Sequence, residues 1–254
     1  MLNESFATGD SLLHRLDPRL RIVFATLFSF LIAVSKDCST LEAGLALAVF
    51  LVLMSWLPLV DVAKRLTVIN SFNLLLFLVL PVTFEGTAVF SIGPFDCTRE
   101  GLILAGQITL KSNAILLAFI AMVATMTIAT LGNTLNRLHV PQKIVYLLLI
   151  AYRYVFVLEQ EYLRLTKAIR VRGFRPKTDS HTYKTYAYLF GMLLVRASSR
   201  ADRVYQAMLC RGFKGRFYCI HQFSFSRLDR IWSVILLIYL AFLGDMEWLN
   251  HTIF

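Results

Sequence analysis

The stretch that decides the fold is the apolar run LILAGQITLKSNAILLAFIAMVATMTIATL, residues 102–131, in which Lys111 is the only charged side chain. As one helix this run would measure about 45 Å, which exceeds the roughly 30 Å hydrocarbon core of a bilayer. The rest of the chain is similar, since 57% of its 254 residues are hydrophobic and only 17% are charged. This composition is too apolar for an ordinary soluble domain and predicts an all-α, polytopic membrane protein.

Four further runs have nearly the length of a membrane span: residues 20–35, 41–59, 66–82 and 231–249. Together with residues 102–131 they predict about five transmembrane helices, with the termini on opposite sides. No cleavable signal peptide is evident, because the first 19 residues are polar and end in Asp17, Pro18 and Arg19. We therefore predict transmembrane helices 1–4 in residues 1–131, a domain of amphipathic helices in residues 132–229, and a last span in residues 230–254.

Positive charge is concentrated in the predicted middle domain. Residues 131–229 contain 17 Lys or Arg against 5 Asp or Glu, whereas the complete chain has a net charge of +10. Because Lys and Arg are enriched in the cytoplasmic parts of membrane proteins, this predicts a cytoplasmic middle domain. The N-terminus is then inside and the C-terminus outside, in a multi-pass membrane protein.

Three polar residues inside the predicted spans have two interpretations each. Asn70 and Asn73 are typical of hydrogen bonds between helices, with a substrate site as the alternative. Lys111 either marks a functional site, because an ion is costly inside a membrane, or reaches the interface by snorkelling from a long helix.

Neither the cysteines nor the histidines have the spacing of a metal site. The four cysteines form no C-x-x-C motif and the five histidines are scattered. Cys38 and Cys97 fall on the predicted outer side, where free thiols are expected and a disulfide is the alternative. The sequence also lacks a phosphate-binding G-x-x-x-x-G-K-[ST] loop, a carboxylate pair and a nucleophile elbow, so no catalytic residue, metal or cofactor is predicted.

After residue 131 the pattern changes to helices with one apolar face. Residues 154–173 carry a stripe formed by Leu158, Tyr162, Leu165 and Ile169. Residues 186–212 carry another, formed by Phe190, Leu194, Ala197, Ala201, Val204 and Met208. The small residues Ala197 and Ala201 favour a close helix crossing. A basic row runs beside this stripe, formed by Arg196, Arg200, Arg203 and Arg211.

The apolar residues 144–158 are ambiguous, because a sixth span is the alternative. The segment is only 15 residues long and contains Arg153. A span here would carry the basic helices to the outer face, against the charge distribution. We therefore expect the buried first half of a long cytoplasmic helix.

One eight-residue phrase occurs twice, 39 positions apart: AIRVRGFR at residues 168–175 and AMLCRGFK at residues 207–214. Each copy places an arginine, Arg172 or Arg211, in the last turn of a predicted helix, with Gly173 or Gly212 just beyond it. A helix C-cap explains this much. Glycine relieves the left-handed backbone conformation there, and arginine interacts with the helix dipole by about 0.3–1 kcal/mol.

A C-cap does not explain why the flanking residues recur too. Ala168 and Ala207 precede the two motifs at the same offset, and Phe174 and Phe213 follow them. An arginine at a helix end, followed by an exposed phenylalanine, suits insertion into a pocket of another protein, where guanidinium pairs with carboxylate or carbonyl groups. Two equivalent ends predict two equivalent pockets, as in a dimer or a pseudo-symmetric heterodimer. Nucleic acid or lipid headgroups would explain the charge but not the repetition, and no nucleic-acid partner is predicted.

With these motifs the chain, over about residues 9–245, resembles the T component of energy-coupling factor (ECF) importers, a family with two Arg-Gly motifs on cytoplasmic coupling helices. Residues 11–19, SLLHRLDPR, are similar to its N-terminal element, and residues 135–141, LNRLHVP, to its L-x-x-L-x-V-P segment. The run RASSRADRVYQAM, residues 196–208, is closer to the cobalt-type branch, CbiQ, than to the shared T component of vitamin importers. Val171 and Cys210 stand where the family commonly has alanine.

The resemblance implies a non-catalytic subunit in the lipid bilayer of a bacterial cytoplasmic membrane, which links two cytoplasmic ABC-type ATPases to a substrate-binding integral membrane subunit. ATP and Mg would be bound by the ATPases. Arg172 and Arg211 would dock on the ATPases, with Gly173 and Gly212 as helix stops. The implied cargo is cobalt(II), with nickel or a vitamin as alternatives.

We expect motion to reach the substrate subunit through the small-residue crossing at Ala197 and Ala201, flanked by Leu194 and Val204. A stand-alone secondary transporter is the rival interpretation. It would place several ionisable groups at mid-membrane, and Lys111 is the one strong candidate.

Overall fold

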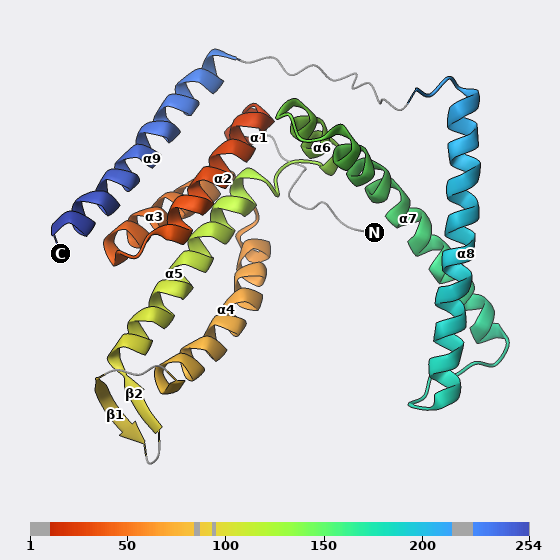
Figure 1. Ribbon diagram of the computed structural model, residues 1–254, viewed down its shortest axis with the longest axis horizontal. Coiled ribbons are helices and arrows are strands. Elements are labelled where there is room, and N and C mark those ends of the chain that lie inside the picture. Colours follow the sequence, from red (N-terminus) through yellow and green to blue (C-terminus); the bar gives the residue numbers. More distant parts are fainter. Residues whose placement is uncertain (1–10, 84–86, 93–94, 215–225, 254) are drawn as a thin grey trace. The chain divides into compact units, whose positions relative to one another are not determined.

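The computed structural model describes residues 11–83, 87–92, 95–214 and 226–253 (Figure 1). The helices in these ranges are α1 (Leu12–Arg15), α2 (Pro18–Val34), α3 (Cys38–Met54), α4 (Leu59–Thr83), α5 (Arg99–Met122), α6 (Ile128–Arg137), α7 (Gln142–Val171), α8 (Ser180–Cys210) and α9 (Arg227–Ile253). A short antiparallel hairpin, β1 (Ala88–Ile92) and β2 (Phe95–Thr98), lies between α4 and α5, with Ser91 opposite Asp96. The prediction of an all-α membrane protein is confirmed, and the hairpin is a small addition to it.

The chain divides into two compact units, which are described separately. The first, here called the apolar unit, contains residues 3–131 and 223–254, and the second, the basic unit, contains residues 132–222. Helices α2, α3, α4, α5 and α9 belong to the apolar unit. Helices α7 and α8 and most of α6 belong to the basic unit.

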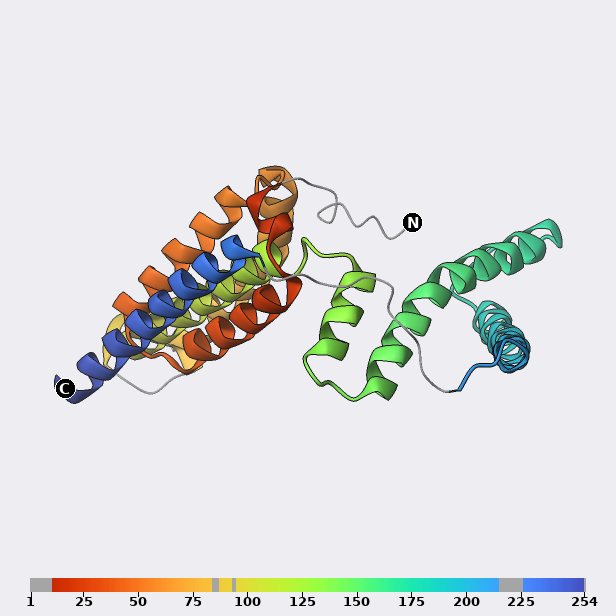
Figure 2. The ribbon, with the colours of Figure 1, turned by 90° about the horizontal axis from the view of Figure 1, so that it is seen from above.

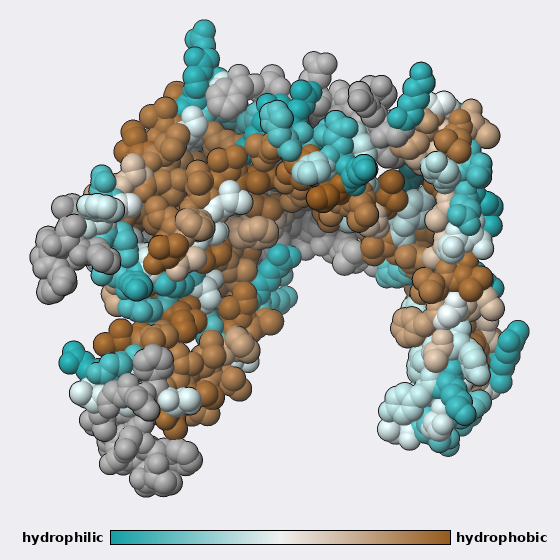
Figure 3. Space-filling view, in the orientation of Figure 1, coloured by the Kyte–Doolittle hydropathy of each residue, from teal (hydrophilic) through white to brown (hydrophobic). Residues whose placement is uncertain are grey.

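Among the described residues, three helices are long and apolar enough to cross a membrane: Leu59–Thr83, Arg99–Met122 and Arg227–Trp248. Helix α3 is apolar but has 17 residues, and α2 also has 17, which is the lower limit for a span. The face of the apolar unit seen in Figure 3 carries large hydrophobic areas, and residues such as Phe30, Leu78 and Ile238 of this unit are exposed. This surface suits contact with lipid.

Two predicted spans have the wrong limits. The run 41–59 ends early as α3, because Pro58 and the turn before it separate α3 from α4. Helix α4 then begins at Leu59, seven residues before the predicted span 66–82, and ends one residue beyond it. Residues 60–65 therefore extend the third span and do not form a connection.

The predicted 30-residue helix at 102–131 is wrong. Helix α5 ends at Met122, and a turn leads into α6 at Ile128. The buried Arg21 of α2 holds this break, because its Nε donates to the carbonyl of Met122 at 2.9 Å and its guanidinium also bonds the hydroxyl of Thr125. The arginine satisfies a carbonyl that has lost its helical partner.

The core of the apolar unit lies between α2, α3, α5 and α9, and includes Phe28, Leu41, Ile120 and Leu243. Helix α9 runs alongside α2 and α3 in both ribbon views (Figures 1 and 2). Helix α2 begins at a side-chain cap: the carboxylate of Asp17 accepts from Arg19 N at 2.9 Å, and Pro18 is the first helical residue.

Polar residues within the helices of the apolar unit join neighbouring elements. Asn73 of α4 donates to Ser112 Oγ of α5 at 2.7 Å, which confirms its interpretation as an interhelical group. Lys111 Nζ donates to the carbonyl of Ala33 at 3.0 Å, in the last turn of α2. That carbonyl lacks an intrahelical partner, and the negative end of the helix dipole favours a cation there. Lys111 thus has a structural role.

Candidate functional site: two Arg-Gly helix ends

The two copies of the repeated phrase form the same backbone motif. Helix α7 ends at the C-cap Arg172, and Gly173 follows with φ +81°. The amide of Phe174 donates to the carbonyl of Ile169 at 3.2 Å, and that of Gly173 to Arg170 at 3.0 Å. This pair of bonds defines a Schellman motif, in which the left-handed residue reverses the chain and satisfies the last carbonyls of the helix.

Helix α8 ends in the same way. Arg211 is its C-cap, and Gly212 has φ +75°. The amide of Phe213 donates to Met208 at 3.0 Å, and that of Gly212 to Leu209 at 2.9 Å. Both arginine side chains are exposed, as are Ala168 and Ala207 one turn earlier. The structure therefore presents two accessible guanidinium groups on equivalent helix ends.

The sequence predicted exposed phenylalanines after the two Arg-Gly motifs. In the structure both rings are half-buried against their own chain. The ring of Phe174 packs edge-on against Tyr186 of α8, with centroids 5.8 Å apart. Phe213 lines a groove with Tyr146 of α7 and Met208 of α8. A hydrophobic contact of the residue after the glycine commonly accompanies a Schellman motif, so these rings fix the helix ends and leave the arginines as the accessible groups.

The two ends lie far apart on the basic unit. Phe174 contacts the first turns of α8, near His181 and Tyr186, whereas Arg211 ends that helix. With a rise of 1.5 Å per residue, α8 separates the two arginines by about 40 Å. This distance calls for two docking positions and not one shared pocket.

Helices α7 and α8 cross between these ends (Figure 1). A groove of about 330 Å³ marks the crossing, lined by Ile150, Tyr154 and Leu158 of α7 and by Ala197, Ala201 and Val204 of α8, among others. Ala197, Ala201 and Val204 thus line the groove where α8 faces α7, whereas Leu194 is 73% exposed and lies outside it.

The expected burial of residues 144–158 is not found within this chain. They do form the first part of one long helix, α7, but only Val145 among them is buried, while Ile144 and Leu147 are well exposed. Much of the apolar face of α7 and α8 therefore remains uncovered by the basic unit itself.

An ion pair that was not predicted from the sequence joins the two helices. The carboxylate of Glu161, in α7, pairs with the guanidinium of Arg196 in α8 and lies 3.7 Å from Arg164. The hydrogen bond from Arg196 holds the pKa of Glu161 below its usual value. A signal was present, since Glu161 is one of only five acidic residues in the basic stretch 131–229.

Other predicted features of the chain carry less information. Cys38 and Cys210 are free thiols, whereas the side chain of Cys97 and all of Cys219 lie outside the described residues. Within the described ranges no group of three or more His, Cys, Asp and Glu could hold a metal ion.

Comparison with known proteins supports the resemblance found in the sequence. The model of the CbiQ family, described as a cobalt transport protein, matches residues 9–219. The chain belongs to the CbiQ family.

Among similar proteins are the energy-coupling factor transporter transmembrane proteins EcfT of Bacillus subtilis, Brevibacillus brevis and Listeria innocua. The first is 27% identical over 85% of both chains, the second 27% identical over 94% of this chain and 95% of its own, and the third 28% identical over 85% of both. The CbiQ family match includes both Arg-Gly ends and the α7–α8 crossing. The chain is therefore a membrane protein of a transport family.

Proposed function

We propose that this chain is the transmembrane coupling subunit of an ECF-type importer. In this role it links two cytoplasmic ABC-type ATPases, which bind ATP and Mg, to a substrate-capturing membrane subunit, and has no catalytic residue of its own. The observation that carries the proposal is the duplicated helix end, in which Arg172 and Arg211 are presented by matching Schellman motifs. The proteins to which the chain is similar are named energy-coupling factor transporter transmembrane protein EcfT, which supports membership in such a transporter.

The chemistry of each end fits a groove lined by carboxylate or carbonyl groups. A guanidinium offers five donors in a rigid fork and remains charged, so it docks with a defined orientation. A basic residue follows each phenylalanine, Arg175 at one end and Lys214 at the other, and both are exposed. Two ends about 40 Å apart match two separate ATPase subunits.

The same helices provide a mechanical connection. When the ATPases close on ATP, displacement of the two ends turns α7 against α8. The Glu161–Arg196 pair joins the helices near their crossing and serves as the fixed point of this motion. We place the substrate subunit on the apolar face of α8 that the basic unit leaves uncovered. This face lies around Leu194, Ala197, Ala201 and Val204.

Cobalt(II) is the proposed cargo, bound by the partner membrane subunit. The description of the CbiQ family and the RVYQAM wording at residues 203–208 favour cobalt over nickel or a vitamin. Uptake of radioactive cobalt, nickel and vitamins by cells with and without the proposed ATPase and substrate-binding subunits tests this choice. Competition by nickel at equal concentration would reject cobalt as the preferred cargo.

A secondary transporter is the weaker alternative. Its strongest support was Lys111, whose ammonium group bonds the end of α2.

The N-terminus and the basic unit are proposed to be cytoplasmic, as the charge distribution predicts.

Purification from native membranes in mild detergent tests the coupling role. We expect two ABC-type ATPase subunits to copurify with the chain. Arg172→Ala and Arg211→Ala are each expected to weaken ATPase attachment, and the double variant to abolish transport while the protein still inserts. Arg170→Ala is the matched control, because Arg170 is an exposed arginine of the same last turn that does not cap the helix. Normal uptake by the double variant would refute the assignment of the two arginines.

A further inference from the structure

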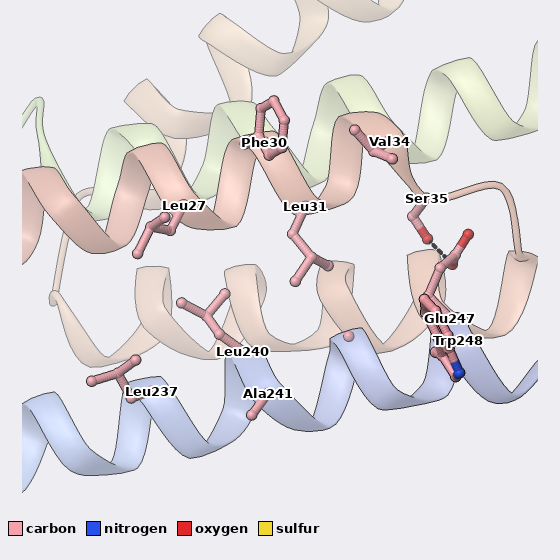
Figure 4. A pocket seen from close by; sticks show the side chains of 11 residues that line it. Leu27, Phe30, Leu31, Val34, Ser35, Leu237, Leu240, Ala241, Glu247 and Trp248 are labelled. Atoms are coloured by element: carbon pink, nitrogen blue, oxygen red, sulfur yellow. Dashed lines mark hydrogen bonds between the residues drawn. The ribbon is translucent and has the colours of Figure 1, made fainter.

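A groove of about 800 Å³ runs along the seam between α2 and α9 in the apolar unit (Figure 4). Its walls are Leu27, Phe30 and Val34 from α2 and Leu237, Ala241 and Gly244 from α9, among others. The volume lies within the range of small-molecule sites, about 300–1,000 Å³. Both helices present exposed hydrophobic residues here, so the groove opens towards the bilayer.

The groove persists because α9 is fixed elsewhere. At one end Asp229 Oδ1 accepts from the amide of Asp17 at 2.9 Å. At the other end the carboxylate of Glu247 accepts from Ser35 Oγ and, at 2.8 Å, from the amide of Lys36. Between these anchors a Cβ on Gly244 would meet no atom within 4 Å. The seam is therefore held at both ends and left unfilled in the middle.

The length of the groove along α2 is close to the thickness of one leaflet of the hydrocarbon core. From Leu27 to Ser35 α2 rises about 12 Å, and half of the hydrocarbon core measures about 15 Å. The polar end carries Ser35, Glu247 and Trp248 (Figure 4), and the indole is 74% exposed. Tryptophan is enriched at membrane interfaces, so this end belongs at the headgroup level. The groove thus starts at the interface and ends near the middle of the bilayer, as an acyl chain does.

The charge at the polar end selects the headgroup. The carboxylate of Glu247 accepts hydrogen bonds from Ser35 Oγ and from the amide of Lys36, and the Thr40 hydroxyl and the Asp37 amide also interact with it, but none of these donors is a cation. The ion pairs found among the described residues are Lys64–Asp61, Arg164–Glu161 and Arg196–Glu161, and Glu247 is in none of them. Its negative charge favours a headgroup with an ammonium donor and opposes a purely anionic one.

We propose that this groove binds an acyl chain of a phospholipid with a primary ammonium headgroup, phosphatidylethanolamine, and that the ammonium group pairs with Glu247. The site goes beyond the coupling role and does not depend on it. It places a lipid between α2, the first span, and α9, the last.

Native mass spectrometry of the full chain tests the proposal. The protein is reconstituted with equal amounts of phosphatidylethanolamine and phosphatidylglycerol, and the lipids retained after release are counted. We expect a preference of about fivefold for phosphatidylethanolamine, the ratio that one partly exposed ion pair sustains. Glu247→Gln should reduce the ratio to near one. Glu42→Gln is the matched control, because it removes an exposed carboxylate from the first turns of α3 without touching the groove.

Filling the groove provides a second variant. Ala241 is exposed on the groove wall, so Ala241→Phe should lower retention of both lipids, whereas Ala46→Phe, at an exposed position of α3 outside the groove, should not. A photoreactive phenylalanine analogue in place of Phe30 reports the occupant without removing any polar contact, and should crosslink to phosphatidylethanolamine. Equal retention of the two lipids by the unmodified chain, or crosslinking of Phe30 to a protein segment, would overturn the proposal.

Discussion

At the residue scale, Gly173 and Gly212 decide how the two key helices end. Their φ angles of +81° and +75° lie in the left-handed region, which costs a residue with a Cβ about 1–2 kcal/mol. A Cβ at either position would meet no atom within 4 Å, so the cost of alanine is purely conformational. The sequence predicted both glycine C-caps correctly, because a C-cap depends on residues that are neighbours in the sequence.

Gly173→Ala and Gly212→Ala are therefore expected to destabilise the basic unit by about 1–2 kcal/mol each. The measurement is thermal unfolding of the full chain in detergent. Gly191→Ala is the control, because Gly191 lies inside α8 with ordinary helical φ and open space around it, and alanine there should stabilise by about 0.5–1 kcal/mol. If all three variants shift the melting temperature in the same direction, the left-handed caps are not the reason for the glycines.

Arg21 is the residue that the sequence did not reveal. It is buried and serves the end of a helix about 100 positions away, donating to Met122 and Thr125. Arg21→Met keeps the size but leaves the carbonyl of Met122 without its donor, which should cost about 1–3 kcal/mol of unfolding free energy. Val23→Met, at an exposed position of the same helix, should be near neutral. Equal melting temperatures for the two variants would show that Arg21 does not hold the break.

At the scale of elements, the sequence predicted where most helices lie, but it predicted only some of the residues at which they begin and end. The start of α2 and the ends of α7 and α8 follow from Asp-Pro and Arg-Gly signals, which act through neighbouring residues. The break after Met122 could not be predicted, because residues 123–127 contain no glycine or proline and the stabilising donor comes from α2. The end of α3 was foreseeable, since Pro58 disfavours helix in the preceding residue.

The α7–α8 crossing depends on the ionised form of Glu161. Its pKa is lowered in the folded protein, first by the hydrogen bond from Arg196 and also by the charges of Arg164 and Arg200. The stabilisation is therefore fully present above the unfolded pKa, about 4.3, and is lost as the pH falls through the lower folded value.

Glu161→Gln is accordingly expected to lower the melting temperature by a constant amount between pH 7 and about pH 5, and by less as the pH falls below the unfolded pKa. Asp202→Asn, which removes an exposed carboxylate of α8, is the control. A difference between wild type and Glu161→Gln that stays the same down to pH 3 would mean that the carboxylate charge does not hold the crossing.

At the scale of the whole molecule, the hydrogen bonds give α2 and α9 the same direction. Their starts are joined through Asp17 and Asp229, and their ends through Ser35 and Glu247. If α2 runs from the cytoplasm outwards, so does α9, and the polypeptide between them returns to the cytoplasmic side before α9 begins. This agrees with the predicted cytoplasmic basic unit, and labelling of single cysteines measures the side directly.

The chain carries its own probes for that measurement. Cys38 begins α3 and Cys210 ends α8, and both thiols are exposed. With Cys97 and Cys219 replaced by serine, a membrane-impermeant maleimide applied to intact cells should label Cys38 but not Cys210. Cys210 should react only after permeabilisation, because the basic unit lies inside. Single Cys38→Ser and Cys210→Ser variants assign each signal. Labelling of Cys210 from outside would place Arg211 beyond the reach of any cytoplasmic ATPase, and the coupling role would fall with the topology.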